Sequence, residues 1–324
     1  MARNRHYRDG KLVQENFPVE EISDCFADPT SIVWLDLCRP DAADLQTLAE
    51  EFGLHALAVE DAMHDHERPK LDRYNSYLFL SAYSAKFDGA ATKLQLGEIA
   101  VFVMPHALVT VRKNEGFDIE QVVARWDSSN ELISEGVGFL LHGLLDVLVD
   151  GHFTAVQSLD DAVESLEDLL FDDRQSQVEV VQRQSFELRK SLVLLRRVVL
   201  PMREVLNTLL HRDLHIVTER MAPYYQDVYD HVLRATEWTD SLRDLVNSIL
   251  EVNITIQGNR MNLIMKKVTS WAAIIAVPTA ITGFYGQNLP YPGFGKQSGL
   301  WWSAGLIVGI GVVLYVMFKK WEWI

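Results

Sequence analysis

The stretch VTSWAAIIAVPTAITGFYGQNLPYPGFG, residues 268–295, contains no charged residue, and QSGLWWSAGLIVGIGVVLYVMF, residues 297–318, contains none either. Both runs reach the roughly 18–20 apolar residues that an α-helix needs to cross about 30 Å of hydrocarbon. The first run exceeds one span, and its tail from about Asn288 is rich in Gly and Pro, which favours a loop. The sequence therefore predicts a membrane protein with two C-terminal spans.

Charge is distributed unevenly along the 324 residues. Residues 1–260 contain 25 of the 30 Lys and Arg and 44 of the 45 Asp and Glu, and the whole chain carries a formal net charge of −15. Nucleic acid is excluded as a partner, because phosphate binding needs a basic face. The start, MARNRHYRDG (1–10), lacks the apolar segment of a signal peptide, so we expect the acidic part to stay in the cytosol.

Basic residues collect on one side of the two predicted spans. The loop between the spans holds one, Lys296, whereas the opposite ends hold five: Arg260, Lys266, Lys267, Lys319 and Lys320. Cytoplasmic flanks are enriched in Lys and Arg, so both termini are predicted to be cytosolic, with the spans in the plasma (inner) membrane.

The acidic part divides near residue 150. Before this point, alternating or β-branched runs predict strands, and apolar spacings of three and four predict helices. The predicted strands are 31–37, 77–87, 96–104 and 107–112, and the predicted helices are 41–52, 119–126 and 137–153. Gly is absent from 152 to 257, which favours long helices, predicted over 153–171, 175–217 and 222–286.

The predicted fold class is an α+β and α-helical membrane protein. An N-terminal α/β cytosolic domain is followed by a long stalk helix that continues into the first of the two transmembrane helices. The expected divisions are a cytosolic α/β domain (1–150), a long-helix stalk (151–265), transmembrane helix 1 (266–288), an external loop (289–299), transmembrane helix 2 (300–318) and a basic, aromatic tail (319–324).

A stripe of small and polar residues runs through the first span. Steps of three and four place the following residues on one face: Asn262, Met265, Thr269, Ala272, Ala276, Thr279, Gly283 and Gly286. In hydrocarbon such a stripe either packs helices closely or lines water. Two spans cannot enclose a pore, so conduction requires an oligomer.

At the outer end of this stripe, ITGFYGQNLPY (281–291) precedes the second span and the ending FKKWEWI (318–324). The arrangement resembles the CorA family of divalent-cation channels, whose signature Tyr-Gly-Met-Asn follows the first of two C-terminal spans. Further segments are similar to that family in the same order: VEDAMHDHERPK (59–70), DVLVDGHF (146–153), LPMREVL (200–206) and PYYQDVYDH (223–231). The resemblance implies a homopentamer with an α/β domain at the end of a funnel of long helices, and a central pore lined by the first span.

The sequence departs from the family pattern at the outer mouth. The signature Met is replaced by Gln287, and the loop LPYPGFGKQSG (289–299) has no carboxylate where relatives usually carry Glu. These departures leave the preferred ion open.

Chemical reasoning indicates how such a mouth works. Mg²⁺ holds its waters tightly, so a pore that binds the hydrated ion passes it more easily than one that strips it. Asn288 from each subunit would present an amide oxygen to those waters beside the backbone carbonyls near Gly286, and Thr279 would form a second ring inward. Tyr285 is expected to brace the loop, and Gln287 adds an amide beside the ring. Alternatively, Asn288 caps the helix.

The resemblance also implies a constriction and a regulatory site. Met265 and Val268 match positions where the family narrows to a hydrophobic constriction, and Asn262, Ala272 and Ala276 continue the lining. Asp61 and Asp227 fall where relatives place an intersubunit metal-sensing pair, and Asp146 falls at a candidate second site. Without the resemblance, each Asp would be interpreted as a surface acid or helix cap.

The favoured function is a channel for Mg²⁺, with Co²⁺ or Ni²⁺ as further ions, gated by cytosolic Mg²⁺. The expected partners are the chain itself, divalent cations and the lipid bilayer. The alternatives are a zinc transporter of the same superfamily and a non-conducting, metal-sensing membrane scaffold. The sequence shows no phosphate-binding loop or nucleophile elbow, so no enzyme activity and no organic cofactor are expected.

Overall fold

The computed structural model describes residues 2–18, 21–25, 28, 30–64, 68–171, 178–211, 214–287, 290 and 293–324. The chain divides into two compact units, Met1–Leu250 and Glu251–Ile324, and one long helix, α7 (Ala222–Tyr285), contributes to both. Each unit is described by itself below.

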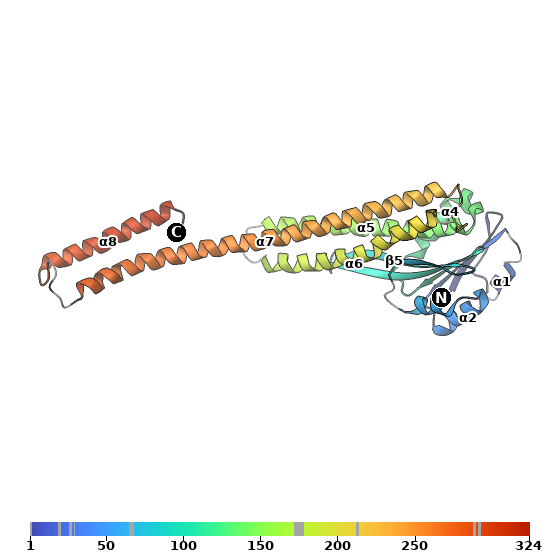
Figure 1. The fold of residues 1–324 in the computed structure, drawn as a ribbon, viewed down its shortest axis with the longest axis horizontal. Helices are drawn as coiled ribbons and strands as arrows, with labels where there is room; N and C mark the ends of the chain where they lie inside the picture. Colours follow the sequence, from blue (N-terminus) through green and yellow to red (C-terminus); the bar gives the residue numbers. More distant parts are fainter. Residues whose placement is uncertain are drawn as a thin grey trace. The chain divides into compact units, whose positions relative to one another are not determined.

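The first unit contains a mixed sheet with helices (Figure 1). Its elements in chain order are β1 (Ala2–Arg8), β2 (Lys11–Glu15), α1 (Ile22–Cys25), β3 (Ser31–Cys38), α2 (Ala42–Phe52), α3 (Ala56–Met63), β4 (Lys70–Arg73), β5 (Leu78–Asp88), β6 (Lys93–Val103), β7 (Ala107–Arg112), α4 (Ile119–Ser128), the 3-10 helix η2 (Asn130–Glu135), α5 (Val137–Phe171), α6 (Val178–His211) and the beginning of α7.

Over the described residues, the strands form one seven-stranded sheet in the order β2-β1-β3-β7-β6-β5-β4. Neighbouring strands are antiparallel except β3 and β7, which are parallel. The four strands predicted from sequence are confirmed as β3, β5, β6 and β7. Their apolar runs are continuous because helices cover both faces of the sheet, so residues on either face are buried.

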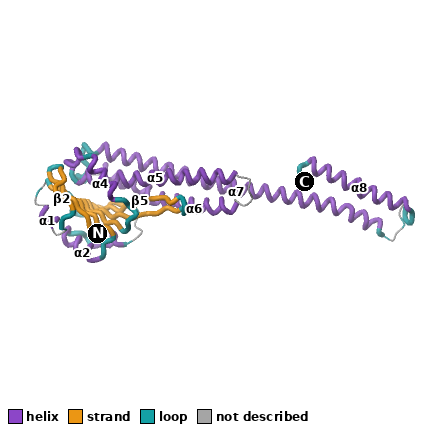
Figure 2. Tube along the Cα trace, turned by 180° about the vertical axis from the view of Figure 1, so that it is seen from behind, coloured by secondary structure: helices purple, strands orange, loops and turns teal. Residues whose placement is uncertain are grey.

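Two hydrophobic cores lie on opposite faces of the sheet (Figure 2). One contains residues of α1, α2 and α3, and the other contains residues of α4 to α7. At the centre of the second core the rings of Trp34 and Trp126 meet edge to face, 4.9 Å between centroids, and the Trp126 indole N–H donates to the Leu140 carbonyl at 3.1 Å. Edge-to-face aromatic pairs add to area burial in stabilising a core.

Three described strands and three short helices are absent from the sequence predictions: β1, β2, β4, α1, α3 and η2. The sequence of β1, ARNRHYR, is rich in charged residues and lacks the apolar alternation that predicts a strand. Arg5 is 5% exposed, and it forms ion pairs with Glu15 of β2 and with Asp127 of α4, the latter at 2.7 Å. Because its charge is paired within the fold, a residue type that favours the surface lies in the sheet.

The segments predicted as two helices, 137–153 and 153–171, are one helix, α5, and residue 150 lies within it. One of the glycines of α5 allows a close contact. A Cβ atom on Gly143 would lie 2.4 Å from the Trp126 indole nitrogen. The prediction that the second long helix extends to 217 is wrong, since α6 ends at His211 and His215 adopts a positive φ of 55°.

In the second unit, α7 pairs side by side with α8 (Gln297–Lys320) (Figures 1 and 2). Three described helices are long and apolar enough to cross a membrane: α5, α7 and α8. The apolar window of α5 is 72% buried inside the protein, whereas those of α7 and α8 are 6% and 0% buried. The apolar residues of α5 therefore form core, and those of α7 and α8 are available to lipid or to further subunits.

Candidate ion pathway and regulatory carboxylates

One face of α7 packs against α8. Ser270 is fully buried, and Ile274, Val277, Ile281 and Tyr285, which follow it in steps of four and three, are half-buried. Near the C-terminal end of α7, Ile281 and Tyr285 line a cavity of about 320 Å³ together with residues of α8. These residues mark the side of α7 that the second span covers.

The predicted pore stripe lies on the opposite side of α7. At about 100° per residue, its centre is roughly half a turn from the face that contacts α8. Met265 is 60% exposed and Val268, at the edge of the stripe, is 63% exposed. The other predicted pathway residues of the helix are exposed too: Asn262, Ala272, Ala276 and Thr279. The second span therefore leaves the stripe uncovered.

Thr279 contributes a polar oxygen to this face. Its hydroxyl donates to the Ile275 carbonyl at 3.0 Å, one turn earlier in the helix. The donated proton is thereby used, and the lone pairs of the hydroxyl oxygen remain exposed. Such an oxygen can accept a hydrogen bond from the water shell of a cation.

The signature residues lie where α7 ends. Gly286 donates its backbone N–H to Thr282 at 2.8 Å, and Gln287 donates its own to Phe284 at 3.3 Å, which closes the last turn. Tyr285 lies on the side of α7 that faces α8, where a bracing side chain is expected, and Asn288 lies outside the described residues.

The loop before α8 turns through glycines. Gly293 and Gly295 adopt φ angles of 98° and 71°, and a Cβ on Gly299 would lie 2.5 Å from the Gly293 carbonyl oxygen. This close approach requires glycine at both ends of the turn. The turn carries Lys296, as the sequence analysis expects.

Asp61 of α3 already has a cationic partner. The Lys70 ammonium donates to its carboxylate at 2.6 Å and lies 3.4 Å from Asp72, and the side chains of Asp61 and Lys70 are each 24% exposed. A metal ion that binds Asp61 must therefore compete with an ammonium group in a partly desolvated place.

Asp227, in the first turns of α7, is more open. Its side chain is 68% exposed, and among the described residues the ionisable side chain paired with it is His231, with 4.0 Å between the carboxylate oxygen and Nε2. The carboxylate can accept a ligand without first losing a strong ion pair.

Asp146 of α5 is buried and paired. Arg125 of α4 lies 2.6 Å from its carboxylate and also donates to Asp150 at 2.8 Å. Burial raises the pKa of Asp146, against the opposing effects of Arg125 and His142, and burial lowers the pKa of the neighbouring His142. This carboxylate is held inside an ion-pair network.

The network connects two of the predicted sites. His231 lies 4.0 Å from Asp150 and 4.0 Å from Asp227, so ionisable groups run from Asp227 through His231, Asp150 and Arg125 to Asp146. Sequence reasoning missed Arg125, Asp150 and His231. The i,i+4 spacings of Asp146 with Asp150 and of Asp227 with His231 were the available signal.

In the described part of one chain, no three His, Cys, Asp or Glu side chains are arranged to hold a metal ion. The contacts of Asp61 and of Asp227 are with different neighbours, Lys70 and His231.

The second unit thus presents an exposed stripe of small and polar residues on α7, and the first unit contains a mixed sheet. Residues 29–320 match the family described as CorA-like Mg²⁺ transporter protein. The chain belongs to this family. CorA-like proteins are membrane transporters of divalent cations, and the predicted family and fold class are confirmed.

Two CorA-like relatives cover nearly the whole chain. The cobalt/magnesium transport protein CorA of Thermotoga maritima is 28% identical over 339 residues, covering 99% of this chain and 94% of the relative. The complete structure of the CorA magnesium transporter from Methanocaldococcus jannaschii has a TM-score of 0.79 at 22% identity, covering 100% of this chain and 99% of that chain. At this identity the structural likeness is evidence of fold alone.

Proposed function

We propose that this CorA-like chain assembles as a homopentameric channel that carries Mg²⁺, and also Co²⁺ or Ni²⁺, into the cytosol. The main support for this proposal is that the small and polar stripe of α7 lies opposite the face that packs on α8. In hydrocarbon, exposed polar groups need protein or water partners. Copies of α7 around a common axis would supply both kinds of partner, and the name of the Thermotoga relative supports Mg²⁺ and Co²⁺.

The proposed capture step uses neutral oxygens. Five Asn288 amides and the carbonyls near Gly286 would accept hydrogen bonds from the waters of Mg²⁺, and the Thr279 hydroxyl oxygens would do so again about two turns inward. Because no oxygen carries a full charge, the ion would bind weakly enough to leave. Met265 and Val268 would narrow the pathway near its inner end.

The proposed placement follows the basic residues. Lys266 and Lys267 mark the inner end of the first span, and Lys319 and Lys320 mark that of the second. Both termini would then be cytosolic in the plasma membrane. The proposed domain limits remain those of the sequence analysis, with the first span beginning inside α7 and the second lying within α8.

Regulation is proposed to use bridging Mg²⁺. Asp61 of one subunit and the exposed Asp227 of its neighbour would hold the ion, which must displace Lys70 from Asp61. Bridging cations would also screen the repulsion of an assembly with a formal charge of −15 per chain. Asp146 would contribute to regulation through its ion pair with Arg125, because that pair already occupies its carboxylate.

Zinc transport is the second candidate, and it is favoured by the two departures at the mouth, Gln287 and a loop without carboxylates. The test is uptake of Mg²⁺, Co²⁺, Ni²⁺ and Zn²⁺ into liposomes that contain the pure protein. The proposal expects Mg²⁺ uptake driven by an inside-negative potential. Zn²⁺ uptake with Mg²⁺ excluded would favour the second candidate, and no flux of any ion would favour a scaffold.

A further inference from the structure

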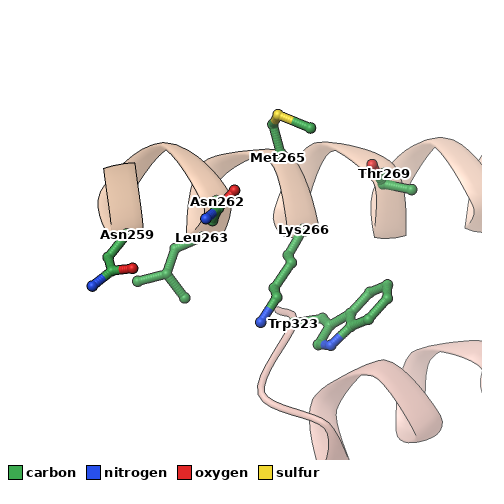
Figure 3. A pocket seen from close by; sticks show the side chains of 7 residues that line it. All are labelled: Asn259, Asn262, Leu263, Met265, Lys266, Thr269 and Trp323. Carbon is green, nitrogen blue, oxygen red and sulfur yellow. The ribbon is translucent and has the colours of Figure 1, made fainter. Parts of the chain in front are cut away.

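A cavity of about 500 Å³ lies within the second unit, between α7 and the tail that follows α8. Asn259, Leu263 and Lys266 lie on the same side of α7 as Trp323, with Lys266 extending to it, whereas Met265 projects from the other side of the helix (Figure 3). The cavity therefore has a wall on the tail side of α7, and its remaining lining residues on this helix, Asn262, Met265 and Thr269, belong to the proposed pore stripe.

The tail is folded into this position. Glu322 adopts a positive φ of 58°, which turns the chain back, and the Trp323 N–H donates to the Phe318 carbonyl at 2.9 Å. The Trp323 ring stacks on Phe318, with 5.6 Å between centroids and 13° between planes, and the Trp321 ring lies 5.9 Å away. These contacts place an indole at the cavity, where it forms part of a built wall.

The surroundings carry positive charge. From residue 252 to residue 321 the chain has no Asp or Glu, and Lys266 and Lys267 lie on α7 while Lys319 and Lys320 end α8. Glu322 is the acidic residue of the tail. A cavity lined by Lys266 and an amide, Asn259, is thus suited to an anion.

The apolar groups around the cavity distinguish between a free phosphate and a phospholipid as the bound anion. Leu263 lines the cavity at 51% exposure, and Ile264 beside it is 53% exposed. The uncharged surface of the spans continues from there toward the outer end. A free phosphate would leave this surface uncovered, whereas a phospholipid covers it with acyl chains. Trp and Lys at such an edge favour the level of the headgroups.

We propose that this cavity binds the headgroup of an anionic phospholipid of the cytosolic leaflet. The Lys266 ammonium and the Asn259 amide would donate to the phosphate, Trp323 would cover the glycerol region, and the acyl chains would lie along Leu263. The lipid would join α7 to the tail of α8. The inference rests on the proposed membrane placement, and it is independent of which ion is carried.

The test measures lipid retention by the full-length protein. Purified protein in detergent is titrated with dioleoylphosphatidylglycerol or dioleoylphosphatidylcholine, and bound lipid is counted by native mass spectrometry. A lysine near a membrane surface contributes enough to predict about fivefold weaker binding of phosphatidylglycerol in Lys266→Gln. Lys267→Gln, the same change one residue away outside the cavity wall, should stay within twofold. Trp323→Leu should weaken binding, and Trp302→Leu, at the other end of α8, should not.

Equal losses in Lys266→Gln and Lys267→Gln would overturn the proposal, because a diffuse field would then explain binding. It would also be overturned if inorganic phosphate displaced the lipid from the wild type but not from Lys266→Gln, or if phosphatidylcholine bound as well as phosphatidylglycerol. Mg²⁺ uptake into phosphatidylcholine vesicles tests the channel separately, so failure of the lipid site leaves that result interpretable. If Trp323→Leu does not fold, the comparison of Lys266→Gln with Lys267→Gln still tests the lipid site.

Discussion

At the residue scale, one amide side chain, that of Asn288, is proposed to capture the ion. Asn288 follows the closed last turn of α7, directly after Gly286 and Gln287. A neutral amide oxygen can bind the waters of an ion without holding the ion permanently. The alternative is a helix cap, which would affect stability and leave permeation intact.

Asn288→Ala should reduce Mg²⁺ uptake into liposomes to near background, because the capture ring is lost, while the assembly elutes as the wild type does. Asn207→Ala, on an exposed position of α6, is the control and should keep full uptake. Undiminished flux through assembled Asn288→Ala would rule out the ring.

The ion pair between Asp61 and Lys70 makes gating predictions of opposite sign. Asp61→Asn or Asp227→Asn removes a ligand, so current should persist at cytosolic Mg²⁺ concentrations that close the wild type. Lys70→Gln removes the competing ammonium at 2.6 Å. Partly exposed pairs contribute up to about 1 kcal/mol, so closure should need about two- to fivefold less Mg²⁺.

Patch-clamp recordings with graded cytosolic Mg²⁺ would measure both shifts. Lys86→Gln, an exposed lysine of β5, is the matched control and should close as the wild type does. If Lys70→Gln also closed at the wild-type concentration, competition at Asp61 would be absent.

At the scale of the element, α5 shows how a helix that is apolar enough to span a membrane is kept in the core. Its apolar window is 72% buried, and Gly143 lets the helix approach Trp126. The Trp126 indole cannot easily withdraw, since it donates to the Leu140 carbonyl at 3.1 Å.

Gly143→Ala should therefore destabilise the first unit by about 1–3 kcal/mol, the usual cost of overpacking, less the gain in helix propensity. Gly151→Ala is the control on the same helix, because a Cβ there meets only the Ala85 carbonyl oxygen at 3.9 Å. It should be neutral or slightly stabilising. Thermal unfolding of the two variants measures the difference, and equal midpoints would contradict a close contact at Gly143.

The loop between α7 and α8 carries a second prediction at this scale. Loop carboxylates concentrate cations through a field screened over about 8–10 Å, so a loop bearing Lys296 without an acid should attract divalent ions poorly. Lys296→Glu should tighten half-saturation of Mg²⁺ uptake, most clearly at low ionic strength. Gln287→Met should leave it within a few-fold.

The opposite pattern would identify local geometry as the basis of selection. In that case Lys296→Glu would change nothing at low salt, and Gln287→Met would reorder the uptake of Mg²⁺, Co²⁺ and Zn²⁺.

At the scale of the whole molecule, the acidic composition acts on assembly. Each chain has a formal net charge of −15, and nearly all of the acidic residues lie before residue 261. In an oligomer, like charges repel across subunits unless cations bridge or screen them. Divalent ions should therefore hold the acidic units together more effectively than monovalent salt.

Removing Mg²⁺ with a chelator should loosen the acidic units while the spans stay assembled. Limited proteolysis should then cut residues before 261 several-fold faster, and millimolar Mg²⁺ should restore protection. Raising KCl to the same ionic strength should restore protection only in part. Monovalent salt weakens the repulsion between subunits by screening, but it cannot form a bridge between two carboxylates. Full restoration by KCl would argue against bridging at Asp61 and Asp227.

The sequence by itself determined the features whose signals are local. Uncharged length predicted both spans, alternation predicted β3, β5, β6 and β7, and the motif around Gly286 indicated the family. These predictions succeeded because hydropathy and periodicity belong to neighbouring residues and need no knowledge of the remaining chain.

Only the tertiary structure decided the features that depend on distant partners. Arg5 lies in a sheet because Asp127 pairs with it from 122 residues away, and Asp146 is buried because Arg125 meets it. The uncovered side of the stripe follows from where α8 packs, and the cavity at Lys266 follows from the return of Trp323. The free energy of a buried charge depends on its partner, and no pattern of neighbouring residues contains that partner's position.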